Sequence, residues 1–166
     1  IEGTSNNKAI EIYNGTGAEV DLSNYTVYLY SNGASTPTNT LALSGTLANN
    51  DVYVIANSQA SSTIKAVADT ASAVTNYNGD DALALWNETT ASYSDIFGCI
   101  GERPTNPSYW GTDPYVTVEK TLVRKSSVSG GVTSNPASGF PTLATEWDSY
   151  SQDTFTYLGS HTYGSK

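Results

Sequence analysis

The side chains best able to do chemistry in this chain are few and stand far apart. A hydrolytic triad needs a nucleophile, a general base and an acid that orients the base, all within reach of one another. The base would have to be His161, because the chain has 1 histidine. His161 stands between Ser160 and Thr162, and no nucleophile-elbow motif surrounds any serine. We therefore expect a surface or edge-strand histidine and no catalytic triad.

Paired carboxylates are the other acid–base option, since glycosidase chemistry needs two of them across a cleft. Asp80 and Asp81 are adjacent, so in an extended segment they point to opposite faces and do not form such a pair. Glu146 and Asp148 alternate around Trp147 and can share a face. We expect structural or solvated carboxylates at both places. A hydrolase-associated domain with a loop-built catalytic site is the alternative function.

Calcium is the metal that this sequence could hold, because it takes carboxylate, amide and carbonyl oxygens from loops. The segment Asn78-Gly79-Asp80-Asp81 is the best local cluster of such groups, with Asp80 and Asp81 as candidate ligands. It lacks the regular spacing of a calcium loop. The favoured role for both aspartates is capping backbone amides in a turn, and no other cofactor is expected.

Three aromatic side chains are candidates for binding a polysaccharide, whose apolar ring faces stack on exposed aromatics. Tyr109 and Trp110 lie in a segment rich in Pro and Gly, and Trp86 ends an expected strand. In the competing interpretation Trp110 folds back over the core. We expect Trp110 to be partly exposed and Trp147 to belong to the core.

Four positions are candidates for glycosylation, provided that the source glycosylates secreted proteins. Asn14, Asn24 and Asn87 each begin an Asn-x-Thr sequon. Thr70 lies in Asp69-Thr70-Ala71, which resembles a short bacterial O-glycosylation signal. A chain so rich in Asn and Thr also contains these triplets by chance.

The composition favours an extracellular domain built from strands. Tyrosine occurs 12 times and Met is absent. Thr and Tyr suit pleated surfaces, and Asn, Ser and Gly supply turns. The formal net charge is −9 with only 7 Lys and Arg, which disfavours nucleic acid as a partner because phosphate binding needs basic clusters. The single Cys99 leaves no disulfide, and its apolar neighbours predict a buried, inert thiol.

The chain begins Ile1-Glu2-Gly3 and contains no signal peptide and no transmembrane run. We expect a mature or excised part of something larger, located outside the cell or on its surface and not inserted in a membrane. The length of 166 residues suits one domain over residues 1–166.

Alternating or apolar runs bounded by turn residues predict eight strands. They are Ala9–Tyr13, Tyr25–Ser31, Asn39–Ser44, Asp51–Ala56, Ala82–Trp86, Ser94–Ile100, Thr121–Lys125 and Thr154–Leu158. The three- and four-residue spacing of apolar side chains in Ser61–Ala73 predicts one short helix. Gly101–Val118 and Ser126–Thr142 are expected to be long loops. This pattern fits a sandwich of two antiparallel sheets, with a small barrel as the competing architecture.

Several motifs follow one another in order along nearly the whole chain. They are Lys8-Ala9-Ile10-Glu11-Ile12-Tyr13-Asn14, Val20-Asp21-Leu22-Ser23-Asn24-Tyr25, Gly45-Thr46-Leu47, Val52-Tyr53-Val54-Ile55-Ala56, Asn78-Gly79-Asp80-Asp81-Ala82-Leu83-Ala84-Leu85, Asp95-Ile96-Phe97-Gly98 and Thr121-Leu122-Val123-Arg124-Lys125. This succession resembles the lamin tail domain as it occurs in secreted bacterial proteins. The resemblance implies an all-β, immunoglobulin-like β-sandwich. Within it, we expect Ile10, Ile12, Val54 and Leu83 to face inward, and Glu11 and Tyr53 to point out.

The same resemblance implies an accessory module, since bacterial members stand beside extracellular nucleases, phosphatases and other surface proteins, and the family shares no catalytic residues. We expect a non-catalytic binding or adhesion module. Its expected partners are neighbouring domains or protein subunits that dock at a sheet edge, with polysaccharide as a second ligand class. A structural subunit of an extracellular assembly is a further alternative.

Overall fold

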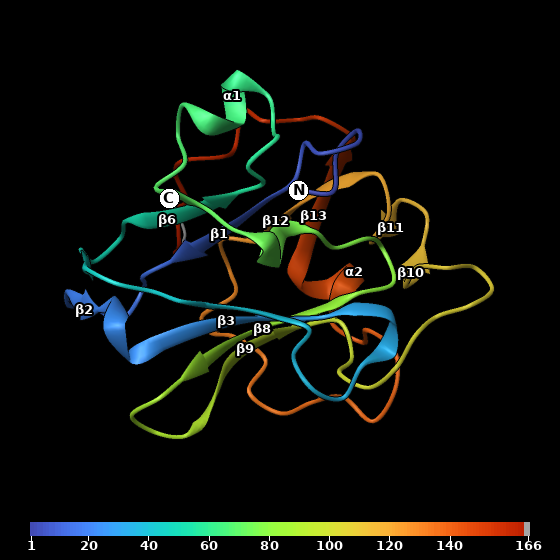
Figure 1. Ribbon diagram of the computed structural model, residues 1–166, viewed down its shortest axis with the longest axis horizontal. Coiled ribbons are helices and arrows are strands. Elements are labelled where there is room, and N and C mark those ends of the chain that lie inside the picture. The colour runs from blue at the N-terminus through green and yellow to red at the C-terminus, as the bar shows by residue number, and fades with distance from the viewer. Residues whose placement is uncertain (165–166) are drawn as a thin grey trace.

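The computed structural model describes residues 1–164 and consists of short strands stacked in layers (Figure 1). The strands are β1 (Ala9–Tyr13), β2 (Val20–Asp21), β3 (Tyr25–Tyr30), β4 (Asn39–Ala42), β5 (Thr46–Leu47), β6 (Val52–Ala56), β7 (Thr70–Ala71), β8 (Ala82–Asn87), β9 (Ser92–Phe97), β10 (Gly111–Thr112), β11 (Tyr115–Val116), β12 (Lys120–Arg124) and β13 (Trp147–Ser151). The helical turns are α1 (Ser62–Lys65), α2 (Leu143–Glu146), η1 (Leu22–Asn24), η2 (Ser31–Gly33) and η3 (Ala73–Thr75). The all-β prediction is confirmed.

The larger sheet has four antiparallel strands in the order β4-β3-β8-β9. Side chains on β3 alternate between its faces, so Val27 and Leu29 point to one side while Tyr28 and Tyr30 point to the other. A β-bulge between Leu85 and Trp86 shifts the register of β8 against β9. Both faces of this sheet therefore carry large side chains that need cover.

The second sheet has the order β1-β6-β7, and β1 is its edge strand. Ile10 pairs with Ile55, and Ile12 pairs with Tyr53. These four residues share one face and pack on the main core, so the prediction that Tyr53 points outward and Val54 inward is wrong. Val54 is nonetheless buried. The alternation misleads here because the opposite face of this sheet is covered too.

The main core lies between the two sheets and confirms the immunoglobulin-like β-sandwich. Its fully buried members come from both sheets and from the turns at the ends of the sandwich. They are Leu22, Val27, Leu29, Leu43, Leu47, Ile55, Val74 and Tyr77. Figure 1 shows the sheet that contains β3, β8 and β9 beneath β1 and β6.

The outer face of the four-stranded sheet is covered by the two long loops. Trp110 from the first loop and Phe140 from the second pack with Tyr30 and Ile96. Trp110 is only 4% exposed, so the expectation of a partly exposed Trp110 is wrong. Gly98 makes room for it, because a Cβ there would lie 2.8 Å from the indole carbon Cζ3. Cys99 is buried in the same layer, as predicted.

The outer face of the three-stranded sheet is covered by α1 and by the C-terminal segment. Ile64 of α1, with Phe155 and Leu158, packs with Ala9 and Ala56. The helix predicted over residues 61–73 is one turn, and its last residues instead form β7. The strand predicted over residues 154–158 is wrong, because this segment forms turns that lay Phe155 and Leu158 on the sheet.

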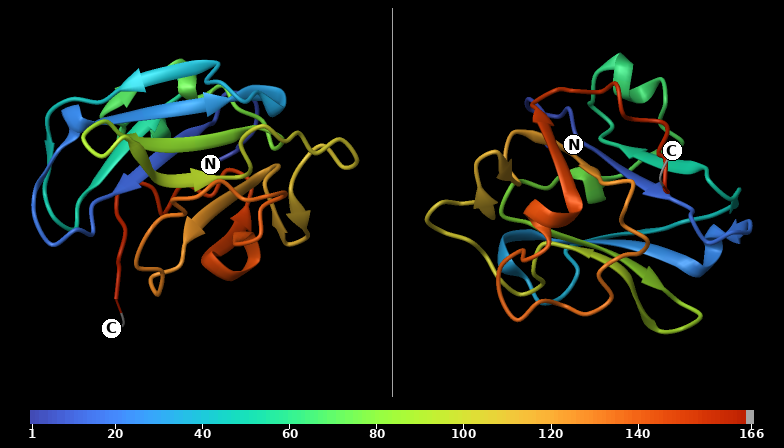
Figure 2. Two further views of the ribbon diagram at one scale, coloured as in Figure 1. Left: turned by 90° about the horizontal axis from the view of Figure 1, so that it is seen from below. Right: turned by 180° about the vertical axis from the view of Figure 1, so that it is seen from behind.

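The chain between residues 98 and 151 adds a second pair of strands beside the sandwich. β12 and β13 form an antiparallel ribbon, in which Arg124 pairs with Trp147. A small hairpin of β10 and β11 lies within the first predicted loop. α2 leads into β13 and is a second α-helical turn, which the sequence did not predict. Figure 2 shows the ribbon from two further directions.

Within residues 1–164, no helix has the length and apolar character needed to cross a membrane.

Candidate functional site

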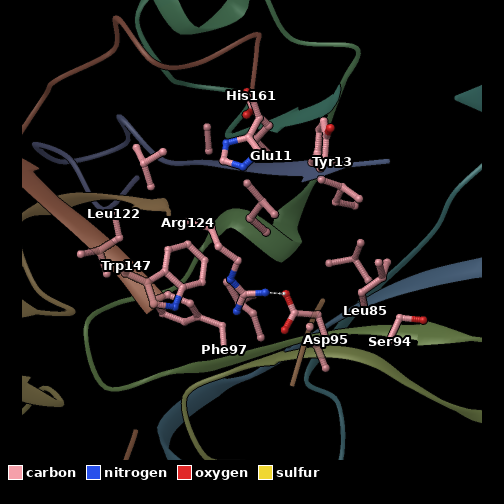
Figure 3. A pocket seen from close by; sticks show the side chains of 18 of the residues that line it. Glu11, Tyr13, Leu85, Ser94, Asp95, Phe97, Leu122, Arg124, Trp147 and His161 are labelled. Atoms are coloured by element: carbon pink, nitrogen blue, oxygen red, sulfur yellow. Dashed lines mark hydrogen bonds and ion pairs between the residues drawn. The ribbon is translucent and has the colours of Figure 1, made fainter. Parts of the chain in front are cut away.

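A cavity of about 540 Å³ opens between the edge strand β1 and the β12–β13 ribbon (Figure 3). We call it the β1–β12 groove. Its apolar lining includes Ile12 of β1, Leu85 of β8, Phe97 of β9 and Leu122 of β12. The groove therefore reaches from the free edge of one sheet into the interior of the sandwich.

One end of the groove is closed by the first two residues of the chain. The Ile1 amino group donates a hydrogen bond of 2.8 Å to the Ala9 carbonyl oxygen, and the Ala9 N–H donates one of 3.3 Å to the Ile1 carbonyl. On the other side, the Glu2 N–H donates to the Lys120 carbonyl at 3.0 Å. Ile1 and Glu2 thus act as a very short strand between β1 and β12.

A buried ion pair fixes this closed end from inside. The Lys8 ammonium lies 2.8 Å from Glu2 Oε1 and also donates to the Tyr77 carbonyl and to Asn78 Oδ1. Lys8 is only 7% exposed. Burial lowers the pKa of the Ile1 amino group to about 6, against the opposing influence of Glu2 and Glu11.

Arg124 is the main charged group in the groove wall, and acidic and aromatic partners surround it. Its Nη1 lies 2.7 Å from Asp95 Oδ2, and its Nη2 lies 3.4 Å from Glu146 Oε2. The guanidinium carbon lies 4.5 Å from the centre of the Trp147 ring. Figure 3 shows the pair with Asp95 in the middle of the groove. The arrangement neutralises Arg124 and does not create a nucleophile or a free base.

Some polar atoms of this cluster have no hydrogen-bond partner within residues 1–164. They are Arg124 Nε, Arg124 Nη2, Glu146 Oε2 and Trp147 Nε1, each buried. Of these, Arg124 Nη2 and Glu146 Oε2 face each other in the 3.4 Å ion pair but do not form a hydrogen bond. Trp147 is half-buried and lines the groove with one ring edge against Phe97, so it borders the core but does not lie inside it. Buried polar atoms without hydrogen-bond partners are uncommon, so Arg124 Nε and Trp147 Nε1 are the least satisfied polar groups of this wall.

His161 lies at the mouth of the groove and packs edge-on against Tyr13, with ring centres 4.9 Å apart. Burial, and to a lesser degree the charge of Arg124, lowers the pKa of the His161 imidazole. In residues 1–164 no hydrogen bond links this imidazole to a serine or a carboxylate. Glu11, which Figure 3 labels beside His161, accepts a 2.6 Å hydrogen bond from the Gly159 N–H. These contacts give His161 a packing role.

The carboxylates of the two candidate calcium ligands, Asp80 and Asp81, accept hydrogen bonds from other groups of the protein. Asp80 Oδ2 accepts a 2.7 Å hydrogen bond from Arg103 Nε. Asp81 accepts from the backbone N–H groups of Asn32, at 2.6 Å, and Asn78, at 2.8 Å. Burial raises the pKa of the Asp81 carboxyl, and these hydrogen bonds oppose the rise. Asp81 therefore caps two turns, which is the favoured role in the sequence analysis. Within the described chain, no three His, Cys, Asp or Glu side chains are grouped to hold a metal ion.

The three aromatic residues that were candidates for binding a polysaccharide do not form one platform. Trp110 is buried under its loop, and Tyr109 is half-buried beside it. Trp86 lies on the outer face of the four-stranded sheet, where its ring centre is 5.0 Å from that of Tyr93 and 6.4 Å from that of Tyr28. Tyr28 and Tyr93 were not predicted as partners of Trp86. Their position on the same face could have been read from the strand alternation.

The glycosylation candidates differ in their surroundings. Asn14 is 3% exposed, and its Nδ2 donates hydrogen bonds to the carbonyls of Ala18 and Leu47. A glycan on that nitrogen is incompatible with the fold, so Asn14 is a structural residue. Asn24, Asn87 and Thr70 are each half-buried.

Comparison with known proteins gave one family match. The model of the Lamin Tail Domain matches residues 1–97. This segment holds both sheets of the sandwich, while the β12–β13 ribbon and the covering loops follow it. No curated protein and no solved structure matched the chain.

Proposed function

Because this chain belongs to the lamin tail domain family, we propose that it is a non-catalytic extracellular accessory module that docks polypeptide at the free edge of β1. The partners are neighbouring domains or protein subunits. The open groove along β1 carries this proposal. Within residues 1–164 the outer edge of β1 has no strand partner beyond Ala9, and such an edge beside an apolar cavity suits the addition of a strand. The location on the cell surface or outside the cell is part of the same proposal.

The state of the charged groups supports a module without catalysis. The groove places Arg124 against Asp95 and Glu146, and His161 against the Tyr13 ring. Acid–base catalysis needs a group that is free to exchange a proton with a substrate. The groove offers Arg124 and unpaired backbone instead, and these groups suit hydrogen bonding to a peptide.

Light scattering and edge variants test the docking. We expect the purified chain to self-associate, or to bind a neighbouring domain of its parent protein, at rising concentration. Substitution Ile12→Lys places a charge in the groove and should weaken that association at least about tenfold. The matched substitution Thr40→Lys, on the exposed face of the β4 edge, should leave it unchanged. Equal effects of the two substitutions would contradict docking at β1.

A glycan is the second candidate ligand, and the Tyr28–Trp86–Tyr93 cluster favours it. A glycan array with the chain and its Trp86→Ala variant tests this candidate. We expect the variant to lose any signal, because ring stacking supplies the binding energy. Binding that survives in Trp86→Ala would locate the glycan elsewhere.

Activity assays test the absence of catalysis. We expect no turnover of nuclease, phosphatase, esterase or glycosidase substrates. Turnover that disappears in His161→Ala or in Glu146→Gln would establish the alternative, a hydrolase-associated domain with a loop-built site.

A further inference from the structure

We propose that the side chains of Lys8 and Asn78 become joined by an isopeptide bond, and that Glu2 is the residue that moves the proton. The bond forms within the folded chain and releases one ammonia. It lies inside the domain, so it forms whether or not a partner docks at β1.

The three side chains meet at the ammonium nitrogen of Lys8, Nζ. This nitrogen lies 2.8 Å from Glu2 Oε1 and donates a 3.3 Å hydrogen bond to Asn78 Oδ1. The carbonyl carbon of Asn78 is one C=O bond from that oxygen, so at most about 4.5 Å separates it from Nζ. An amine, a carboxamide and a carboxylate are the nucleophile, the acyl donor and the proton acceptor that an amide exchange needs.

The surroundings of the reacting nitrogen keep water away from it. The side chains of Lys8 and Glu2 are 9% and 13% exposed, and Nζ lies 5.6 Å from the centre of the buried Tyr77 ring. Charged groups lose their hydration on burial, so a proton passes from the ammonium to the carboxylate more readily than it does in water. The neutral amine that results is the nucleophilic form of lysine.

Backbone contacts hold each partner in place. Glu2 forms an antiparallel bridge with Lys8, and Glu2 Oε2 accepts a hydrogen bond from the Glu119 N–H. The Asn78 N–H donates to Asp81 Oδ2 at 2.8 Å, and the Asp81 N–H donates back to the Asn78 carbonyl at 3.1 Å. Groups that are held together in this way react at a high effective concentration, which offsets the low reactivity of a carboxamide.

The reaction exchanges one amide for another. Lys8 passes a proton to Glu2, and the lone pair of Nζ then forms a bond to Asn78 Cγ while the C=O π electrons move to Oδ1. When this tetrahedral intermediate collapses, the Cγ–Nδ2 bond breaks and its electron pair leaves with the nitrogen. Nζ loses two protons in all, and Glu2 transfers both to the leaving nitrogen. The products are the new amide, an ammonium ion and the restored Glu2 carboxylate.

The leaving group has a path to solvent. Lys8 and Asn78 both line a polar cavity of about 440 Å³, and Asn78 is an exposed residue although Lys8 is buried. Ammonium released there is diluted into water. The reverse reaction is therefore negligible, and the bond accumulates.

The bond would join two distant parts of the sandwich. It would tie the start of β1 to the turn before β8, across 70 positions of the sequence. The 166 residues contain a single cysteine, Cys99, and so form no internal disulfide. An isopeptide bond over so long a loop would restrict the unfolded chain as a disulfide does.

Mass spectrometry of the denatured 166-residue chain tests the bond, because an ion pair does not survive denaturation. We expect a mass about 17 Da below that of the sequence, which is the loss of one ammonia. After digestion with trypsin, we expect one peptide in which the segments that contain Lys8 and Asn78 stay joined. This peptide decides the existence of the bond without any variant.

Three variants test the roles of the residues. Lys8→Arg keeps the positive charge but removes the amine nucleophile, and Glu2→Gln keeps the size but removes the proton acceptor. Both should show the full mass of their sequence. Lys125→Arg is the matched control, since the Lys125 ammonium donates to two backbone carbonyls, and it should keep the loss of ammonia. Circular dichroism checks that each variant is folded.

Four outcomes would overturn the proposal. The first is a full mass in the unaltered chain. The second is a loss that persists in Lys8→Arg, because Asn78-Gly79 can also release ammonia by closing a succinimide on its own backbone. The third is a loss of about 18 Da, one water, which would place the new amide on Glu2. The fourth is an undiminished loss in Glu2→Gln, which would remove the assigned proton transfer.

Discussion

Arg124 connects three parts of the molecule through one guanidinium group. It joins β12 to Asp95 on β9 and to Glu146 at the end of α2, and it covers the Trp147 ring. Its side chain is 16% exposed, so its ion pairs are less screened by water than pairs on the open surface. At the residue scale, this side chain holds the β12–β13 ribbon against the sandwich.

Substitution Arg124→Ala should therefore lower the free energy of unfolding by roughly 2–4 kcal/mol, because it leaves Asp95 and Glu146 without their partner. Chemical denaturation measures this change. Lys120→Ala is the control, since its partner Asp113 is 81% exposed, and it should cost less than about 0.5 kcal/mol. Equal small losses would mean that the ribbon is held by its apolar contacts alone.

The Ile1 amino group makes stability depend on pH. Its pKa falls from 8.0 to about 6 on folding, so the unfolded chain binds more protons between these values. The free energy of unfolding should therefore rise with pH between about 6 and 8, by at most roughly 2 kcal/mol. Denaturation curves over this range measure the rise.

Acetylation of the Ile1 amino group provides the control, because it removes the charge and leaves the fold contacts. The lowered pKa of His161 acts in the same direction and remains in the acetylated chain. The slope should become smaller after acetylation. An unchanged slope would assign the whole pH dependence to other groups.

At the scale of elements, the long loops behave as a packed layer and not as flexible connections. Trp110 rests on Gly98, and its backbone N–H donates a 3.0 Å hydrogen bond to Thr117 Oγ1. The same hydroxyl donates to the Gly79 carbonyl at 2.6 Å. The first loop is thus fixed to the turn before β8 as well as to the sheet.

Trp110→Ala should consequently cost roughly 3–5 kcal/mol of unfolding free energy, as expected for a buried large aromatic side chain. Trp86→Ala, which removes a half-buried ring, should cost clearly less. Thermal and chemical unfolding of the two variants measures the difference. A small loss for Trp110→Ala would show that the loop lifts away in solution.

The sequence predicted elements best where apolar alternation is strong. β1 was predicted with its observed bounds, and β3, β4, β6, β8, β9 and β12 were predicted within two or three residues at each end. β13 was missed because Trp147–Ser151 is mostly polar and is held by its pairing with β12. The alternating run Thr154–Leu158 instead predicted a strand, although Phe155 and Leu158 pack on the sheet from turns.

The candidate site was harder to predict than the fold. Arg124 and Asp95 belong to two different sequence motifs, and neither motif indicates that the two side chains meet. Their contact joins residues 29 positions apart and depends on how β12 lies against β9. The groove itself is lined by β1 and β12, which lie far apart in the sequence, and no local pattern encodes how two such distant strands are placed.

At the scale of the whole molecule, the family match and the folded unit have different extents. Residues 98–164 supply Trp110 and Phe140 to the outer layer and the whole β12–β13 ribbon. Asp153 also accepts hydrogen bonds from the Thr4 N–H, at 3.0 Å, and from the Thr4 hydroxyl, at 2.6 Å. The C-terminal part of the chain therefore fixes the position of the N-terminal segment.

A chain that ends at residue 97 should accordingly fail to fold, although it contains the whole segment that matches the family. Its four-stranded sheet would expose Tyr30 and Ile96 to water. Circular dichroism and the dispersion of amide signals in NMR measure this, with the full chain as the control. A cooperative unfolding transition in the short chain would show that residues 98–164 are not needed for folding.

The double pairing of Ile1 and Glu2 has a mechanical consequence. A tether attached at Ile1 and pulled along the strand direction would load the hydrogen bonds to Ala9 and Lys120 together, in shear. Bonds that share a load in this way yield at higher force than bonds that open one after another.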